Sequence, residues 1–180
     1  PKFVMTSSVA VFGGDLPNKV PDQWALKPRS SYGAEKAICE LMVGEYSRRG
    51  FVDGRVLRLP TIVVRPGRPN RAASSFASSI IREPLRGEPA VCPVAPETPM
   101  WLMSPDRAVD AFVHVYDLQS ARLGDDRVIS MPGLSVTAAE MVAALERVAG
   151  VDVAQRVEWQ FDAAIADIVQ SWPGDFEATR

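Results

Sequence analysis

Hydrophobic residues occur along this chain in short runs, separated by a longer segment of helical spacing. Residues 3–12 form a mainly apolar run that ends at two glycines, and residues 55–64 form a second. Between them, apolar positions recur every three or four residues from Ser31 to Arg49. Short apolar runs are typical of buried strands, and the recurrence is typical of a helix. The pattern therefore predicts strand, helix, strand, which is a crossover unit of a parallel sheet.

The rest of the chain alternates the same two patterns with loops. We expect helices near residues 74–82, 105–118, 135–149 and 161–170, and strands near residues 99–103, 127–131 and 157–159. Thr137 and Glu140 have the spacing of a capping box. The proline-rich segments 15–30, 65–73 and 83–99 are expected to be loops. The predicted fold class is α/β.

Composition narrows the classes of function. The chain has 180 residues, 47% of them hydrophobic, which is enough for one domain or two small lobes. The net charge of −2 gives no support for binding nucleic acid or a membrane surface. No run approaches the ~18 apolar residues of a membrane span. Cys39 and Cys92 lack metal-ligand spacing, so we expect no metal site and two buried, reduced thiols.

Three polar side chains fall where the predicted elements meet. Ser8 lies near the end of the first apolar run, and Tyr32 and Lys36 are four residues apart in the following helix. That spacing puts Tyr32 and Lys36 on one helix face. A cation beside a phenol favours the phenolate, and a nearby hydroxyl completes a set suited to proton transfer. We therefore predict a site of general acid and base catalysis.

The same residues carry a resemblance to a known family. Residues 7–13 read Ser-Ser-Val-Ala-Val-Phe-Gly, a proline-bearing loop follows, and then comes Tyr32-x-x-x-Lys36. This combination, with Leu-Pro-Thr-Ile at residues 59–62, resembles the extended short-chain dehydrogenase/reductase family, of the NAD-dependent epimerase/dehydratase type. Residues 47–78 are similar to the branch of that family that oxidises D-erythronate.

The resemblance implies a fold and a division of the chain. The fold would be the C-terminal part of a doubly wound Rossmann-type parallel sheet, with a small α/β substrate-binding lobe. Residues 1–64 would be the second half of the NAD-binding domain and carry the Ser/Tyr/Lys site. Residues 65–180 would be mainly the substrate-binding lobe, with residues 105–133 partly returning to the Rossmann sheet.

The resemblance also implies a reaction and roles in it. A hydride would pass to NAD, or to NADP, from the C2 hydroxyl of a small sugar acid. Tyr32 would be the general base, Lys36 would assist it and hold the nicotinamide ribose, and Ser8 would hydrogen-bond the reacting oxygen. Pro60 and Ile62 would contact the nicotinamide. A cytoplasmic homodimer formed through the Tyr32 helix is the expected assembly.

An acid substrate needs a cation, and Arg binds carboxylates bidentately. The candidates for substrate binding, besides Ser8, are Arg65, Arg107, Ser74 and Ser75. The cluster Arg65, Arg68 and Arg71 is alternatively a solvated charged surface, and Ser74 and Ser75 are alternatively helix caps. Ser7 is the alternative to Ser8. The single histidine, His114, is expected to be structural.

One departure from the family tempers this interpretation. The Gly-rich phosphate turn that should precede such a segment is absent from these residues. The chain also begins at Pro1, directly before an apolar strand, so we interpret it as a fragment that binds NAD poorly alone. Two other functions stay open: a nucleotide-sugar epimerase or dehydratase of the same fold, and an inactive or non-catalytic binding module.

Overall fold

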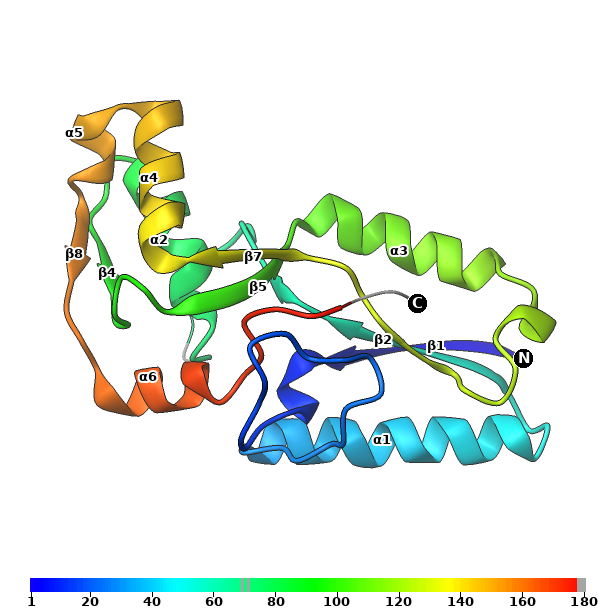
Figure 1. Ribbon diagram of the computed structural model, residues 1–180. Helices are drawn as coiled ribbons and strands as arrows, with labels where there is room; N and C mark the ends of the chain where they lie inside the picture. Colours follow the sequence, from blue (N-terminus) through cyan, green and yellow to red (C-terminus); the bar gives the residue numbers. More distant parts are fainter. Residues whose placement is uncertain (69, 71, 178–180) are drawn as a thin grey trace.

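The computed structural model describes residues 1–68, 70 and 72–177. A parallel sheet of order β1-β2-β6 lies at its centre, formed by β1 (Lys2–Ser8), β2 (Asp53–Leu59) and β6 (Val128–Ser130). Helix α1 (Ser31–Arg48) covers one face of this sheet, and α3 (Pro105–Asp117) covers the other (Figure 1). The fold is thus the predicted α/β type with a Rossmann-like parallel sheet.

A second lobe lies beyond the carboxyl ends of β1 and β2 (Figure 1). Its parallel pair is β4 (Ala90–Cys92) and β8 (Val157–Trp159). Its helices are α2 (Ser75–Leu85), α4 (Ala138–Ala149), α5 (Val151–Ala154) and α6 (Ala163–Gln170). A mixed sheet of order β3-β5-β7 joins the lobe to the rest, with β3 (Thr61–Ile62), β5 (Pro99–Met103) and β7 (Leu134–Thr137). Two short 3-10 helices, η1 (Val9–Val11) and η2 (Ser120–Arg122), complete the elements.

Several sequence predictions of elements need correction. The run 3–12 is not one strand, because β1 ends at Ser8 and turns into η1. The run 55–64 divides at Pro60, and its two parts pair in different sheets. The helix expected from Ser135 starts instead at Ala138, after strand β7. The segment expected to be irregular between residues 83 and 99 contains β4.

Other predictions of elements are confirmed. Helix α1 runs close to its predicted bounds, with Ser30 as its N-cap. Thr137 and Glu140 form the predicted capping box at the start of α4. That box lowers the pKa of Glu140, chiefly through the backbone N–H and then the hydroxyl of Thr137. A capping carboxylate at a helix start is stabilised in this way.

The hydrophobic cores follow the two lobes. The larger cluster joins α2, α4 and α6 to the strands of the second lobe, with Ile80 and Met141 among its buried members. A smaller cluster under α3 contains Leu57 and Val115. Cys92 is buried, as predicted, and burial raises the pKa of its thiol. Cys39 is exposed on α1, so its predicted burial is wrong; both thiols are free.

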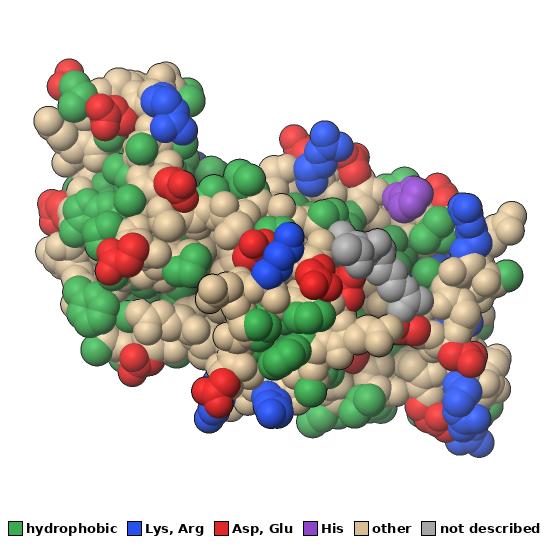
Figure 2. All heavy atoms as spheres, in the orientation of Figure 1, with side chains coloured by type: hydrophobic (Ala, Val, Ile, Leu, Met, Phe, Trp, Pro, Cys, Tyr) green, Lys and Arg blue, Asp and Glu red, His purple; other side chains and the backbone are tan. Residues whose placement is uncertain are grey.

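Charged side chains are spread over the surface. On the face in Figure 2, Lys and Arg side chains lie among Asp and Glu side chains. Within the described part of the chain, every helix is too short or too polar to cross a membrane.

Candidate active site

A cavity of about 650 Å³ opens at the carboxyl ends of β1 and β2. Ligands of open parallel sheets bind at this end of the strands. The residues that line it include seven that the sequence singled out: Ser7, Ser8, Tyr32, Pro60, Ile62, Arg65 and Ser74. Segments far apart in the chain therefore meet at one site, which joins the central sheet to the second lobe.

Ser8 owes its position to the end of β1. Its backbone is still extended, and its Oγ accepts a hydrogen bond from the backbone N–H of Ala10 at 3.2 Å, which caps η1. Because this bond uses a lone pair of the oxygen, the hydroxyl proton can be donated to a ligand in the cavity. Ser8 thus caps η1 and lines the cavity at the same time.

Tyr32 stands in the first turn of α1, where its side chain is 51% exposed. The Ser30 hydroxyl accepts from the backbone N–H of Gly33 at 3.1 Å and so fixes the start of the helix. Gly33 lies against the backbone of η1, because a Cβ on it would come within 2.0 Å of the Ala10 carbonyl oxygen. This close approach is what brings the Tyr32 end of the helix to the Ser8 end of the strand.

Lys36 lies one helical turn from Tyr32, on the same side of α1. Its Nζ donates to the backbone carbonyl of Thr6 at 2.9 Å and lies 5.6 Å from the centre of the Tyr32 ring. Thr6 itself lines the cavity. The ammonium is therefore held at the boundary of the site, close to the phenol that the sequence paired with it.

The second lobe supplies the opposite wall. Pro60 and Ile62 follow directly after β2, and Arg65 and Ser74 come from the loop that leads into α2. Trp172 and Ile168 close this side. The residues of this wall combine apolar side chains with the charged Arg65 and the hydroxyl-bearing Thr61 and Ser74.

Two of the substrate candidates lie elsewhere. Ser75 is buried, and its Oγ accepts a hydrogen bond from the backbone N–H of Asn70 at 3.0 Å. Arg107 lies on α3 with its side chain 79% exposed, 3.8 Å from Asp110. Neither lines the cavity that holds Ser8 and Tyr32. Arg71, a member of the arginine cluster, lies outside the described residues.

The sequence reasoning missed a buried polar network directly behind the site. The Ser7 hydroxyl donates to Glu40, and Arg58 forms a bidentate pair with the same carboxylate, with its Nη2 at 2.7 Å from Oε2. Glu40 comes from α1 and Arg58 from β2. For Arg58 the signal was a charged residue inside the predicted buried run 55–64, because buried charges need partners. The network ties β1, α1 and β2 together at the level of the site.

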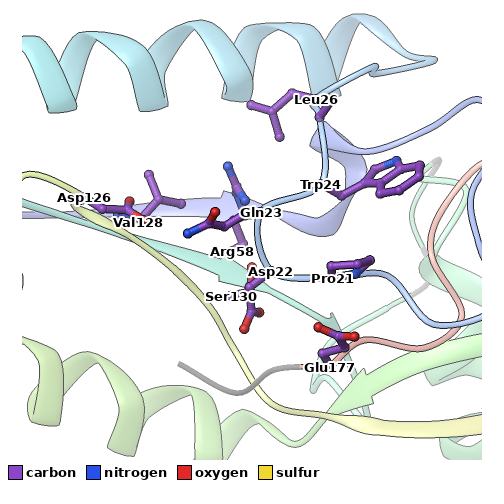
Figure 3. A pocket seen from close by; sticks show the side chains of 11 residues that line it. Pro21, Asp22, Gln23, Trp24, Leu26, Arg58, Asp126, Val128, Ser130 and Glu177 are labelled. Carbon is purple, nitrogen blue, oxygen red and sulfur yellow. The ribbon is translucent and has the colours of Figure 1, made fainter.

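A second cavity, of about 520 Å³, lies beside β2 and β6 (Figure 3). Its walls include the loop 21–26, Arg58, Ser130 and Glu177. The guanidinium of Arg58 is already paired with Glu40. The first cavity, which Ser8, Tyr32 and Arg65 line together, is therefore the candidate site. Among the described residues, no group of three or more His, Cys, Asp or Glu could hold a metal ion.

The geometry defines a class: an α/β protein with a Rossmann-like sheet and a ligand site beyond the carboxyl ends of its parallel strands. The comparisons with known proteins specify that class. The model of the NAD dependent epimerase/dehydratase family matches residues 1–123. The chain belongs to this family.

Its relatives include two named D-erythronate dehydrogenase. The protein from Cupriavidus necator is 62% identical over 180 residues, and that from Haemophilus influenzae is 49% identical over 179 residues. The match covers 100% and 99% of this chain but only 56% and 57% of those proteins. The chain thus spans about half the length of the curated relatives it matches.

A solved structure gives the same picture. The crystal structure described as a nucleoside-diphosphate-sugar epimerase from Agrobacterium tumefaciens superposes with a TM-score of 0.94 at 46% identity. The superposition covers 99% of this chain and 52% of that one. The fold described above is therefore that of the corresponding half of a family member.

Proposed function

We propose that this chain carries the catalytic half of an NAD-dependent dehydrogenase that oxidises the C2 hydroxyl of D-erythronate or a similar small sugar acid. The observation that carries the proposal is the single cavity where Ser8, Tyr32 and Arg65 meet. The two relatives named D-erythronate dehydrogenase support the substrate. In this proposal residues 1–64 serve the cofactor side, and residues 65–180 serve mainly the substrate side.

The chain's own groups divide the work on the substrate. Tyr32 is the general base that takes the proton of the C2 hydroxyl, and the Lys36 ammonium lies 5.6 Å from the centre of its ring. The Ser8 hydroxyl donates a hydrogen bond to the same oxygen and holds it near the phenol. Arg65 pairs with the substrate carboxylate, and Ser74 at the start of α2 is placed to donate a further hydrogen bond.

The residues at the site fit a nicotinamide cofactor. Pro60 and Ile62 offer apolar surface in the cavity, and Tyr32 and Lys36 offer hydroxyl and ammonium donors at its edge. We propose that Pro60 and Ile62 contact the nicotinamide, and that Lys36, with Tyr32 beside it, holds the nicotinamide ribose. When bound, the nicotinamide would supply the hydride acceptor.

The test is an assay of the complete gene product with D-erythronate and either NAD or NADP. Reduction of NAD is expected, measured by the absorbance of NADH. The 180-residue chain alone is assayed beside it and is expected to be much less active. Absence of NADH formation with D-erythronate and with its four-carbon stereoisomers would sink the substrate proposal.

The role of the phenol has its own prediction. Tyr32→Phe removes the proton acceptor without changing the shape of the side chain, so kcat should fall by about 10²–10⁴-fold. Tyr46→Phe, on the same helix but outside the cavity, is the matched control and should keep its rate. A near-normal rate for Tyr32→Phe would remove Tyr32 from the mechanism.

The name of the Agrobacterium structure favours one alternative, a nucleoside-diphosphate-sugar epimerase. It is distinguished by incubating the gene product with nucleotide sugars and following epimer formation by NMR.

The two free thiols suit a reducing compartment, and we place the protein in the cytoplasm. We also propose a homodimer formed through α1, whose outer face exposes apolar side chains, namely Ile38, Leu41, Met42 and Tyr46.

A further inference from the structure

One face of α2 holds the backbone of the loop that carries Arg65. Ser78, Arg82 and Arg86 are four residues apart, so they share this face. The Ser78 hydroxyl accepts from the backbone N–H of Arg65 at 3.1 Å, and Arg82 Nη1 donates to the Arg65 carbonyl at 2.7 Å. Arg86 Nη1 donates to the Gly67 carbonyl at 3.3 Å. Both backbone groups of Arg65 are therefore fixed by side chains of the helix.

Arg82 is itself held rigidly. It is 7% exposed, and its Nε and Nη2 both donate to Glu83 Oε1, at 3.0 and 2.7 Å. Its Nη2 also lies 3.3 Å from the Ser79 hydroxyl. The Nε and Nη2 edge of the Arg82 guanidinium thus binds Glu83, and Nη1 is the atom that binds the Arg65 carbonyl. A lysine ammonium is a compact point charge and cannot reproduce this divided geometry.

We propose that Arg82 is a positioning residue for substrate binding, which acts by fixing Arg65 at the cavity wall. The inference rests on the proposed function, in which Arg65 binds the substrate carboxylate. A long arginine side chain loses much rotamer freedom on binding a ligand, and a fixed backbone reduces what remains to be ordered. The buried pair Arg82–Glu83 therefore determines how well the site holds an acid, although neither residue lines the cavity.

The test is a double-mutant cycle on the complete gene product, with D-erythronate as substrate. Arg65→Ala is expected to raise KM by about tenfold or more, because a charge-assisted contact is lost. Arg82→Lys should raise KM by about three- to tenfold with little change in kcat. In the Arg65→Ala background, Arg82→Lys should raise KM no further, because the group that it positions is gone.

Two further variants keep the test decisive. Ser78→Ala removes the other hold on Arg65 at little cost in volume and should also raise KM. Arg48→Lys is the matched control, since this arginine forms a similar fork with Glu45 on the exposed surface of α1, outside the cavity, and the substitution should leave KM unchanged. Thermal unfolding of each variant identifies any that fails to fold.

The outcomes separate the two proposals. No activity of the unmodified protein would overturn the proposed function. Activity with an Arg65 effect, but equal effects of Arg82→Lys in both backgrounds, would overturn the positioning role alone.

Discussion

The close contact between Gly33 and Ala10 brings the Ser8 end of β1 and the Tyr32 end of α1 to the same cavity. The sequence could predict that Ser8 and Tyr32 lie close together, because each lies in a short, recognisable pattern at an element end, and both line one cavity. Their meeting depends on a glycine, since any Cβ at residue 33 would collide with the Ala10 carbonyl oxygen. The buried ion pair between Glu40 and Arg58, in contrast, could not be predicted from a local pattern. It joins positions far apart in the chain, and nothing local in the sequence specifies the pair.

Gly33→Ala is therefore expected to push α1 away from η1 and to separate the phenol from the Ser8 hydroxyl. We expect a loss of about 1–3 kcal/mol in the free energy of unfolding, together with most of the activity. Gly44→Ala is the matched control, because a Cβ there meets nothing within 4 Å. That variant should gain about 0.5–1 kcal/mol through helix propensity. Urea denaturation and the NADH assay measure both, and equal behaviour of the two glycines would contradict this account.

At the scale of elements, one strand boundary was predicted wrongly because a single apolar run contributes strands to two different sheets. Leu59 and Ile62 belong to one apolar run, yet Leu59 in β2 pairs in the central sheet and Ile62 in β3 pairs with β5. The hydrophobic pattern of a sequence predicts which residues are buried, but it does not predict which strand pairs with them. The capping box of α4 was predictable because a cap is a local contact. Strand β7 just before it exists only because β5 lies alongside.

The start of β2 is held to β6 by charge. Asp53 pairs with Arg55 and with Arg127, which immediately precedes β6. Burial alone would raise the pKa of Asp53, but the Ser120 hydroxyl and the two guanidinium groups outweigh it and lower the pKa. The folded protein therefore binds fewer protons at this site than the unfolded chain does, and stability increases with pH through this range.

The stabilisation from Asp53 is expected in full above the ordinary carboxyl pKa of ~4 and should be lost as the pH falls through the lower folded-state value. Asp53→Asn should cost about 2 kcal/mol at neutral pH. As the pH falls below 4 and through the lower folded-state pKa of Asp53, the variant and the unmodified protein should converge. Urea denaturation at several pH values measures the difference, with Asp15→Asn in the exposed loop as control. A difference that does not depend on pH would contradict the charge argument.

At the scale of the whole molecule, the outer face of α1 is the surface through which we propose that a homodimer forms. Exposed apolar side chains on a helix that is long and regular mark an interaction surface. If two copies meet there, Leu41→Lys, at a side chain now 71% exposed, should convert a dimer into a monomer. Val148→Lys, at an 86% exposed site on α4, should leave the assembly unchanged. Light scattering after gel filtration measures the mass, and a monomer before any substitution would exclude the interface.

The break at Pro60 has a consequence for how the molecule comes apart. The chain passes from the central sheet to the second lobe there, returns after β5 into α3, and passes back again between β6 and β7. Its end returns once more, where Phe176 forms a bridge with Val20. No single cut of the backbone can therefore release either lobe with its hydrophobic core complete. The two lobes should therefore unfold in one cooperative transition. The cavity wall that carries Arg65 should lose its structure at the same denaturant concentration as strand β1, which ends at Ser8.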